Sequence, residues 1–321
     1  MRAVLFALLL WPAALLADTA PDEALAWLQK IASAARELNY SGTFVYQYGN
    51  HVETSRIVHA VDGSGEQEKL EILDGLPREI IRSNDEVRCY LPESKTVMVE
   101  KRTRRTKSFP ALLPEQLNNL SESYLIKMGG HERIAGFDCQ ALILEPRDGL
   151  RYGHKFWAEI NSGLLLKASM LDENNEVVEQ FAFTQLSIGG PIDKEMLKPR
   201  FSANTPEWRY DHAAQAEPFS TSTGWAIRHP LAGFKKIMET RRVISGKPAP
   251  ISHIVYSDGL AAVSVFIEPL GSKTKPMNGL QKRGALNVYT KPVADFQITV
   301  LGETPPITVM EIGNSVYYSG K

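Results

Sequence analysis

The strongest constraint on the fold is a set of three apolar and aromatic runs within residues 149–190. Short polar segments separate the runs, Asn-Ser-Gly at 161–163 and Asp-Glu-Asn-Asn at 172–175, and both have the composition of turns. Segments this short cannot carry the crossover that a parallel pair of strands requires. Each run must therefore turn back on the one before it, so the segment is predicted to be an antiparallel meander.

The middle run of the meander shows which way its side chains point. Leu164, Leu166, Ala168 and Met170 alternate along it, whereas Lys167 lies on the other face. One face of the predicted sheet is therefore strongly apolar and the other only partly so. A wide sheet with such a face must be covered by helices, by another sheet or by a ligand.

The residues before the meander predict a helix followed by strands. Apolar residues recur at helical spacing from Ala24 to Leu38, and from Tyr40 the apolar period changes to two. Strand-like runs continue to about residue 200, interrupted by a short helix predicted over residues 114–124. This part of the chain is therefore predicted to form one long antiparallel sheet with two helical segments.

The length of 321 residues, of which 43% are hydrophobic, suits a protein of two domains. Residues 204–222 mix Pro, Ala, Ser and Thr without periodicity, which is typical of a linker. Further strand-like runs follow, with a hairpin turn at 257–259 and a closing helix capped by Thr304. We therefore predict a first domain over residues 18–203, a linker over 204–222, and a smaller second domain over 223–321 that ends in a helix.

Residues 1–17 are predicted to be a cleaved secretory signal. Arg2 precedes an apolar stretch that ends in Leu-Leu-Ala at 15–17, which fits a small-residue cleavage site. The alternatives are an anchor or a buried first helix, but the stretch is shorter than the roughly 20 residues that span a bilayer. The mature chain is therefore expected outside the cytoplasm.

That compartment permits a disulfide between Cys89 and Cys139, the two cysteines of the chain. Both residues lie inside strand-like runs, so the alternative is a pair of buried free thiols. Neither residue belongs to a CxxC motif, which leaves a redox-catalytic role without support. The pattern alone leaves the disulfide open.

Catalytic and metal-binding patterns are missing from the sequence. The histidines have no ligand spacing, and His131-Glu132 does not begin an HExxH motif because Ala135 stands at the place of the second histidine. There is no GxSxG elbow, and neither cysteine has a neighbouring base. We therefore predict a protein that is not an enzyme and has no metal and no cofactor. A net charge of −1 also disfavours nucleic acid as a partner.

A basic cluster is the sharpest charge feature of the chain. Its members are Lys101, Arg102, Arg104, Arg105 and Lys107. Such a loop can bind phosphate or carboxylate groups on a lipid, a polysaccharide or an acidic protein segment. The alternative is a solvated strand end whose charges protect a sheet edge from aggregation.

A second candidate site is formed by aromatic side chains on the apolar face of the predicted sheet. They can line a cavity for acyl chains. The alternative is that the two helices cover this face completely. The candidate residues are Phe44, Tyr46, Tyr48, Trp157, Phe181 and Phe183.

Several separate segments resemble one known family. They are YSGTFVY at 40–46, HERIAGFDC at 131–139, YGHKFWAEINSGLLL at 152–166, YSDGLAAVSVFIEP at 256–269 and VLGETPP at 300–306. With the signal sequence and the first helix, these segments resemble the RseB/MucB family of periplasmic negative regulators of the extracytoplasmic stress sigma factor. The resemblance extends over nearly all of the mature chain.

This resemblance implies a first domain like the lipoprotein carriers LolA and LolB, an unclosed antiparallel β-barrel whose concave face is covered by helices and accepts lipid. It implies a second domain that binds the periplasmic segment of a membrane-spanning anti-sigma factor of the RseA/MucA type and shields it from the site-1 protease. Lipid or lipopolysaccharide would relieve the shield. The alternative function is a periplasmic carrier of lipoprotein or lipid, and the resemblance leaves homo-oligomerisation open.

Overall fold

The structure, a computed structural model, describes residues 21–84, 86–101, 108–114, 117, 119–201, 207–212, 222–242, 249–271 and 275–320. The predicted signal sequence at 1–17 lies outside the described residues, as do Arg102, Arg104, Arg105 and Lys107 of the basic cluster. Among the described residues, no helix is both long enough and apolar enough to cross a membrane.

The first domain is built on a sheet of twelve strands in the order β12-β6-β5-β4-β3-β2-β1-β11-β10-β9-β8-β7. Its first half contains β1 (Tyr40–Tyr48), β2 (His51–Asp62), β3 (Gly65–Ile72), β4 (Arg78–Ser83), β5 (Glu86–Leu91) and β6 (Thr96–Lys101). Its second half contains β7 (Tyr124–Ile134), β8 (Phe137–Pro146), β9 (Gly153–Glu159), β10 (Leu165–Leu171) and β11 (Val177–Ile188). The predicted meander is present as β9, β10 and β11, which pair antiparallel.

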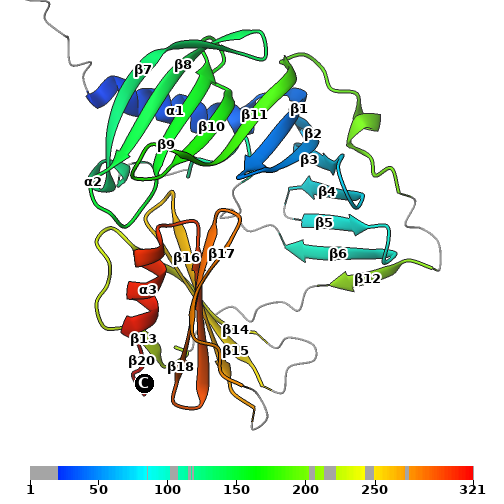
Figure 1. The fold of residues 1–321 in the computed structure, drawn as a ribbon. Coiled ribbons are helices and arrows are strands. Elements are labelled where there is room, and N and C mark those ends of the chain that lie inside the picture. The colour runs from blue at the N-terminus through cyan, green and yellow to red at the C-terminus, as the bar shows by residue number, and fades with distance from the viewer. Residues whose placement is uncertain are drawn as a thin grey trace, which may run out of the picture.

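The sheet bends without closing into a barrel. In Figure 1, β7–β10 run nearly upright, whereas β4–β6 lie across the view, so the two halves face different directions. Its two edge strands are β12 and β7, and they do not pair with each other. The prediction of a mainly β, unclosed antiparallel sheet with covering helices is therefore confirmed.

Helix α1 (Pro21–Glu37) covers one half of this sheet. It lies across β7–β10 in Figure 1 and packs the buried Leu28, Ile31 and Ala35 into the main core. These residues are three and four apart, which puts them on one face of the helix. The ammonium group of Lys30 donates a hydrogen bond of 2.7 Å to the carbonyl oxygen of Ile160, which ties the helix to the β9–β10 turn.

The second predicted helix is shorter than expected. Helix α2 spans only Leu120–Ser123, and the described residues between Pro110 and Leu120 have no regular helix. Leu117, Leu120 and Tyr124, whose spacing predicted the helix, are nevertheless buried in the core of the first domain. The leucine spacing that predicted a helix is thus satisfied by burial of these side chains against the sheet, and tertiary packing overrides the local pattern.

The second domain contains an antiparallel sheet of order β14-β15-β16-β19-β18-β17. Helix α3 (Pro306–Ser315) packs on β18 and β19, and a two-stranded ribbon of β13 and β20 lies beside it (Figure 1). The predicted small sheet with a closing helix is confirmed, but the predicted cap is wrong, because the N-cap residue of α3 is Pro305 and not Thr304. The strands are β13 (Trp225–Ile227), β14 (Lys235–Arg242), β15 (Ile251–Ser257), β16 (Ala262–Pro269), β17 (Gly279–Arg283), β18 (Leu286–Val293), β19 (Phe296–Gly302) and β20 (Val316–Tyr318).

Part of the predicted linker forms a strand. β12 (Arg209–His212) pairs in parallel with β6 and adds to the edge of the first sheet. Next to it, Trp208 packs against Tyr90 and Phe201, with its ring 6.5 Å from each. The composition of residues 204–222 predicted a linker without regular structure. Instead, the contact of Trp208 with Tyr90 and Phe201 and the pairing with the edge strand β6 fix residues 208–212 to the first domain.

Candidate functional site

Five of the six candidate aromatic residues lie together. Phe44, Tyr46 and Tyr48 are on one face of β1, and Phe181 and Phe183 are on the same face of β11. The strand register places Phe44 opposite Phe183 and Tyr46 opposite Phe181. The Tyr46 and Phe181 rings are stacked at 4.5 Å, and the Phe44 and Phe183 rings meet edge to face at 5.8 Å. We call this group the aromatic face.

Trp157 points to the other side of the sheet. Its neighbour Phe156 pairs with Ala168, which pairs with Phe181, so Phe156 is the residue of β9 that shares the aromatic face. The Trp157 ring instead lies between the ammonium groups of Lys155 and Lys167, at 4.5 and 4.4 Å from its centroid. Residue type alone grouped Trp157 with the others, whereas the alternation of side chains along the strand separates it from them.

Phe109 covers the aromatic face from outside the sheet. It lies in the described stretch 108–114, and only 3% of it is exposed. Its ring is stacked on Phe181 at 5.4 Å and lies 5.1 and 5.0 Å from Phe44 and Phe183. Part of the chain itself therefore occupies the space in which an acyl chain was expected. No pattern in the sequence predicted this contact, because Phe109 is a single aromatic residue in a segment without periodicity.

A half-buried carboxylate, that of Glu179, lies at the end of the aromatic face. The hydroxyl of Tyr46 donates a hydrogen bond of 2.8 Å to Glu179 Oε2 on β11. Burial, followed by repulsion from the Glu303 carboxylate, raises the pKa of Glu179 to about 7. Burial and the neighbouring Glu179 also raise the pKa of Tyr46. Glu303 follows β19, so this charge interaction joins the aromatic face to the second domain.

A second interdomain contact is a buried ion pair. Arg151, in the loop between β8 and β9, places Nε 3.5 Å from Asp258 Oδ2 and donates a 2.5 Å hydrogen bond from Nη2 to the carbonyl oxygen of Ala232. The hydroxyl of Tyr124 donates to the same Asp258 oxygen over 3.2 Å. Asp258 belongs to the predicted hairpin turn, and its Oδ1 accepts hydrogen bonds from the amides of Leu260 and Ala261. A turn residue therefore also connects the domains.

Apolar and polar contacts surround this pair. Tyr152 and Met170 of the first domain form a small buried cluster with Ala285 of the second. Asn287 Nδ2 donates to the Tyr152 hydroxyl over 3.2 Å, and Thr308 Oγ1 donates to the carbonyl oxygen of Leu150 over 2.6 Å. No pattern in the sequence identified these residues, because each pairing depends on the docked position of the second domain.

The structure describes only some of the remaining predicted site residues. Lys101 is exposed at the end of β6, opposite Glu86, and the rest of the basic cluster lies outside the described residues. Cys89 and Cys139 are both free thiols, on β5 and β8 in different halves of the sheet, so the possible disulfide is not formed. Burial raises the pKa of both thiols, that of Cys139 to about 11, so neither is a reactive thiolate at neutral pH.

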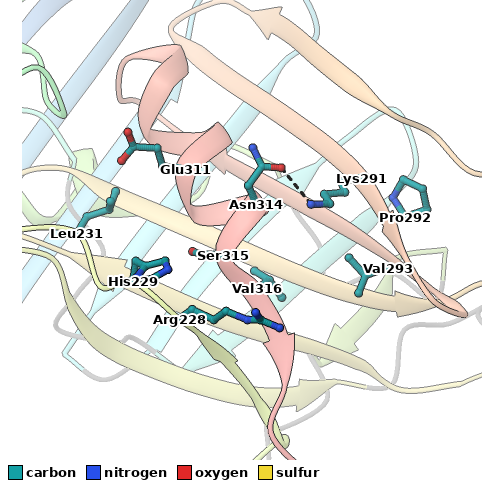
Figure 2. A pocket seen from close by; sticks show the side chains of 10 residues that line it. All are labelled: Arg228, His229, Leu231, Lys291, Pro292, Val293, Glu311, Asn314, Ser315 and Val316. Atoms are coloured by element: carbon teal, nitrogen blue, oxygen red, sulfur yellow. Dashed lines mark hydrogen bonds between the residues drawn. The ribbon is translucent and has the colours of Figure 1, made fainter.

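The second domain contains a further hollow, of about 720 Å³, at the carboxyl end of α3 (Figure 2). Its lining comes from the segment after β13, from β18, from α3 and from Val316 at the start of β20. Among the described residues there is no group of three or more side chains that could hold a metal ion. The described residues thus form a mainly β protein of two sheet domains, with a hollow in the second.

Comparison with known proteins agrees with this class. A model of the MucB/RseB N-terminal domain matches residues 23–201, and a model of the MucB/RseB C-terminal domain matches residues 220–317. The chain belongs to the MucB/RseB family, which confirms the resemblance read from its sequence.

The relatives have the names of regulatory proteins. The chain is 29% identical over 321 residues to the sigma factor AlgU regulatory protein MucB of Pseudomonas aeruginosa, with 98% of each chain covered. It is 26% identical over 294 residues to the sigma-E factor regulatory protein RseB of Escherichia coli K12, with 91% of this chain and 90% of the relative covered. A crystal structure of MucB in complex with MucA(peri) has a TM-score of 0.73 and 26% identity, and covers 93% of this chain and 100% of that chain.

The interaction between the carboxyl groups of Glu179 and Glu303 predicts how the stability of the fold depends on pH. The folded-state pKa of Glu179 is raised from 4.5 to about 7, so its stabilising contribution is complete below about pH 4.5 and is lost as pH rises through 7. We expect Glu179→Gln to match the wild type at pH 4 and to melt at a higher temperature than the wild type at pH 8. Thermal melts at several pH values test this, with the exposed Glu176→Gln as control. Parallel curves for wild type and Glu179→Gln would contradict it.

The interdomain ion pair predicts a large loss of stability in Arg151→Ala. The change leaves the buried Asp258 carboxylate without its cation, which typically costs about 3–5 kcal/mol. Urea unfolding of the full chain measures the loss. The control is Lys127→Ala, which breaks the exposed ion pair with Glu145 and should cost less than about 1 kcal/mol. Equal effects of the two changes would show that the buried pair does not hold the domains together.

Proposed function

We propose that this chain is a periplasmic negative regulator that binds the periplasmic segment of a membrane-spanning anti-sigma factor and shields it from site-1 proteolysis. The observation that supports this most is the relative solved in complex with MucA(peri), whose whole chain is covered by this one. We also propose that the domains extend over residues 18–203 and 223–321, joined by residues 204–222, and that residues 1–17 direct export.

We propose further that the bound state is released when lipid or lipopolysaccharide reaches the aromatic face. An acyl chain would replace Phe109, whose ring packs on Phe181. Phe181 stacks on Tyr46, and Tyr46 binds Glu179, which interacts with Glu303 of the second domain. These contacts form a continuous chain from the lipid site to the domain boundary. Lipid lowers partner affinity only by as much as it favours the released arrangement.

The basic cluster suits the same event. Lys101, Arg102, Arg104, Arg105 and Lys107 directly precede Phe109 in the sequence. Phosphate groups of a lipid head group are natural partners for such cations. A lipid held by its head group at the cluster would have its acyl chains close to the residue that they replace, and the candidate site would then combine the basic cluster with the aromatic face.

A protection assay tests the proposed function. Residues 18–321 are mixed with the periplasmic segment of the anti-sigma factor from the same organism, and its cleavage by the site-1 protease is followed. We expect protection that lipopolysaccharide reverses. Unprotected cleavage together with lipid binding would favour a lipid or lipoprotein carrier instead.

The covering of the aromatic face predicts that Phe109→Ala binds acyl chains more tightly than the wild type. The substitution removes the side chain that a ligand must displace, so the apparent affinity no longer includes that cost. Titration of a fluorescent fatty acid measures the change, and circular dichroism shows whether the fold is retained. Phe296→Ala, at a partly buried residue that packs against the core of the second domain, is the control. Equal affinity of Phe109→Ala and wild type would place the acyl site elsewhere.

A further inference from the structure

The first domain has a hollow that the proposed function does not use. It encloses about 490 Å³, which is in the range of ligand sites. Its lining residues lie at or beside three hairpin turns, those that join β1 to β2, β3 to β4 and β5 to β6. These turns meet at one end of the sheet, because alternate connections of an antiparallel sheet lie at the same end. We call this hollow the hairpin pocket.

Apolar side chains line much of the hairpin pocket, and two of them are open to water. Ile72 is buried at the end of β3, and Leu91 is half-buried at the end of β5. Val52 is 53% exposed, and Leu76, at 67%, is the most exposed of the large hydrophobic side chains that the structure describes. A ligand that covered these side chains with apolar groups would gain the free energy of their burial.

The turn that carries Leu76 is fixed to β2. The backbone amide of Thr54 donates a hydrogen bond of 2.5 Å to Asp74 Oδ2, and the amide of Leu73 donates to the carbonyl oxygen of Thr54 over 2.9 Å. Gly75 takes the left-handed conformation that closes the turn, with a φ of +69°. A turn held in this way loses little freedom when a ligand binds, so the hairpin pocket is preorganised.

Negative charge is in excess around these apolar side chains. The lining residues include three carboxylates, those of Glu53, Asp74 and Glu93, and one guanidinium, that of Arg78. Within the described ranges, no lysine, arginine or histidine lies within 4.0 Å of the carboxylate of Glu53 or of Glu93. Carboxylates without a counter-charge, next to apolar side chains, are complementary to cationic groups that are joined to an apolar one.

The spacing of the two unpaired carboxylates selects an extended ligand. Glu53 belongs to β2 and Glu93 follows β5, and these strands are three spacings apart in the sheet, or about 14 Å. The turn that carries Leu76 joins β3 to β4 and therefore lies between them. In an extended peptide, residues four apart are also separated by about 14 Å and point to the same side, as does the residue midway. One small amine cannot contact both carboxylates, whereas such a peptide can.

We propose that the hairpin pocket binds cationic amphipathic peptides in extended form. Two basic side chains four residues apart pair with Glu53 and Glu93, and the apolar side chain midway between them packs on Leu76. Cationic peptides that bind to bilayer interfaces combine the same residue types, Lys or Arg with Leu or Phe. The inference does not rest on the proposed function, since neither the anti-sigma factor nor a lipid takes part in it.

Neutralising the two carboxylates tests the inference. The mature chain is titrated against the fluorescein-labelled peptide Lys-Ser-Leu-Ser-Lys, amidated at its carboxyl end, and binding is followed by anisotropy. We expect Glu53→Gln with Glu93→Gln to bind at least about tenfold more weakly than the wild type, because both charge-assisted contacts are lost. The matched control is Glu173→Gln with Glu176→Gln, which removes the same charge from exposed residues of the β10–β11 turn and should bind as the wild type does. Thermal melts show whether both variants fold.

A second peptide tests the spacing. Lys-Lys-Leu-Ser-Ser has the same composition with adjacent lysines, so it can pair with one carboxylate at a time and should bind more weakly to the wild type. Equal binding of the two peptides would mean diffuse attraction to negative charge and would overturn the inference.

Three further results would also overturn it. The wild type and the neutralised variant could bind Lys-Ser-Leu-Ser-Lys equally well, or neither could bind it. The periplasmic segment of the anti-sigma factor could displace the peptide, which would assign the hairpin pocket to that partner. A fatty acid could displace it, which would make the hairpin pocket part of the acyl site. Retention of the peptide in the presence of both competitors, with loss of binding in the neutralised variant, supports a separate peptide site.

Discussion

The pairing of β1 with β11 is the contact on which the first domain depends. β1 begins at Tyr40 and its partner β11 ends at Ile188, so the first strand of the domain meets the last strand of the meander across almost the whole domain sequence. Without this pairing, β1–β6 and β7–β11 would be two separate sheets. Gly42 lies at the closest approach, where a Cβ atom would overlap the carbonyl oxygen of Gln185. The aromatic face is formed by the same two strands, so the proposed lipid site exists only once this long-range contact has formed.

The second domain is joined to the first by polar contacts as much as by apolar ones. A buried ion pair such as Arg151 with Asp258 adds little net stability, since desolvation offsets most of the attraction, but it penalises any arrangement that separates the charges. The repulsion between Glu179 and Glu303 acts in the opposite direction at the same boundary. One contact therefore favours the docked arrangement of the domains while another opposes it, and the proposed release by a ligand requires such a balance.

Much of the fold could be predicted from local patterns, because alternation and helical spacing are properties of neighbouring residues. The strands of both sheets and the first and last helices follow from them. The errors arise where distant residues decide the result. Trp157 was grouped with the other aromatic residues by its type, although its position in β9 directs its side chain to the other side of the sheet. Phe109 reaches the aromatic face from a segment without a periodic pattern. Trp208 holds part of the predicted linker by packing against the first domain. The possible disulfide between Cys89 and Cys139 could not be decided from the sequence for the same reason. Only the order of strands shows that β5 and β8 lie in different halves of the sheet.

The parallel pairing of β12 with β6 has a consequence for how far the domains can separate. Because the chain is fixed to the first sheet as far as His212, the tether to the second domain starts there and not at the end of β11. The ten peptide units from His212 to Ser222 can span at most about 35 Å when fully extended. A second domain released from its contacts would thus remain at high effective concentration next to them and would dock again quickly. Under the proposed function, detachment by a ligand would therefore last only as long as the ligand occupies the contact.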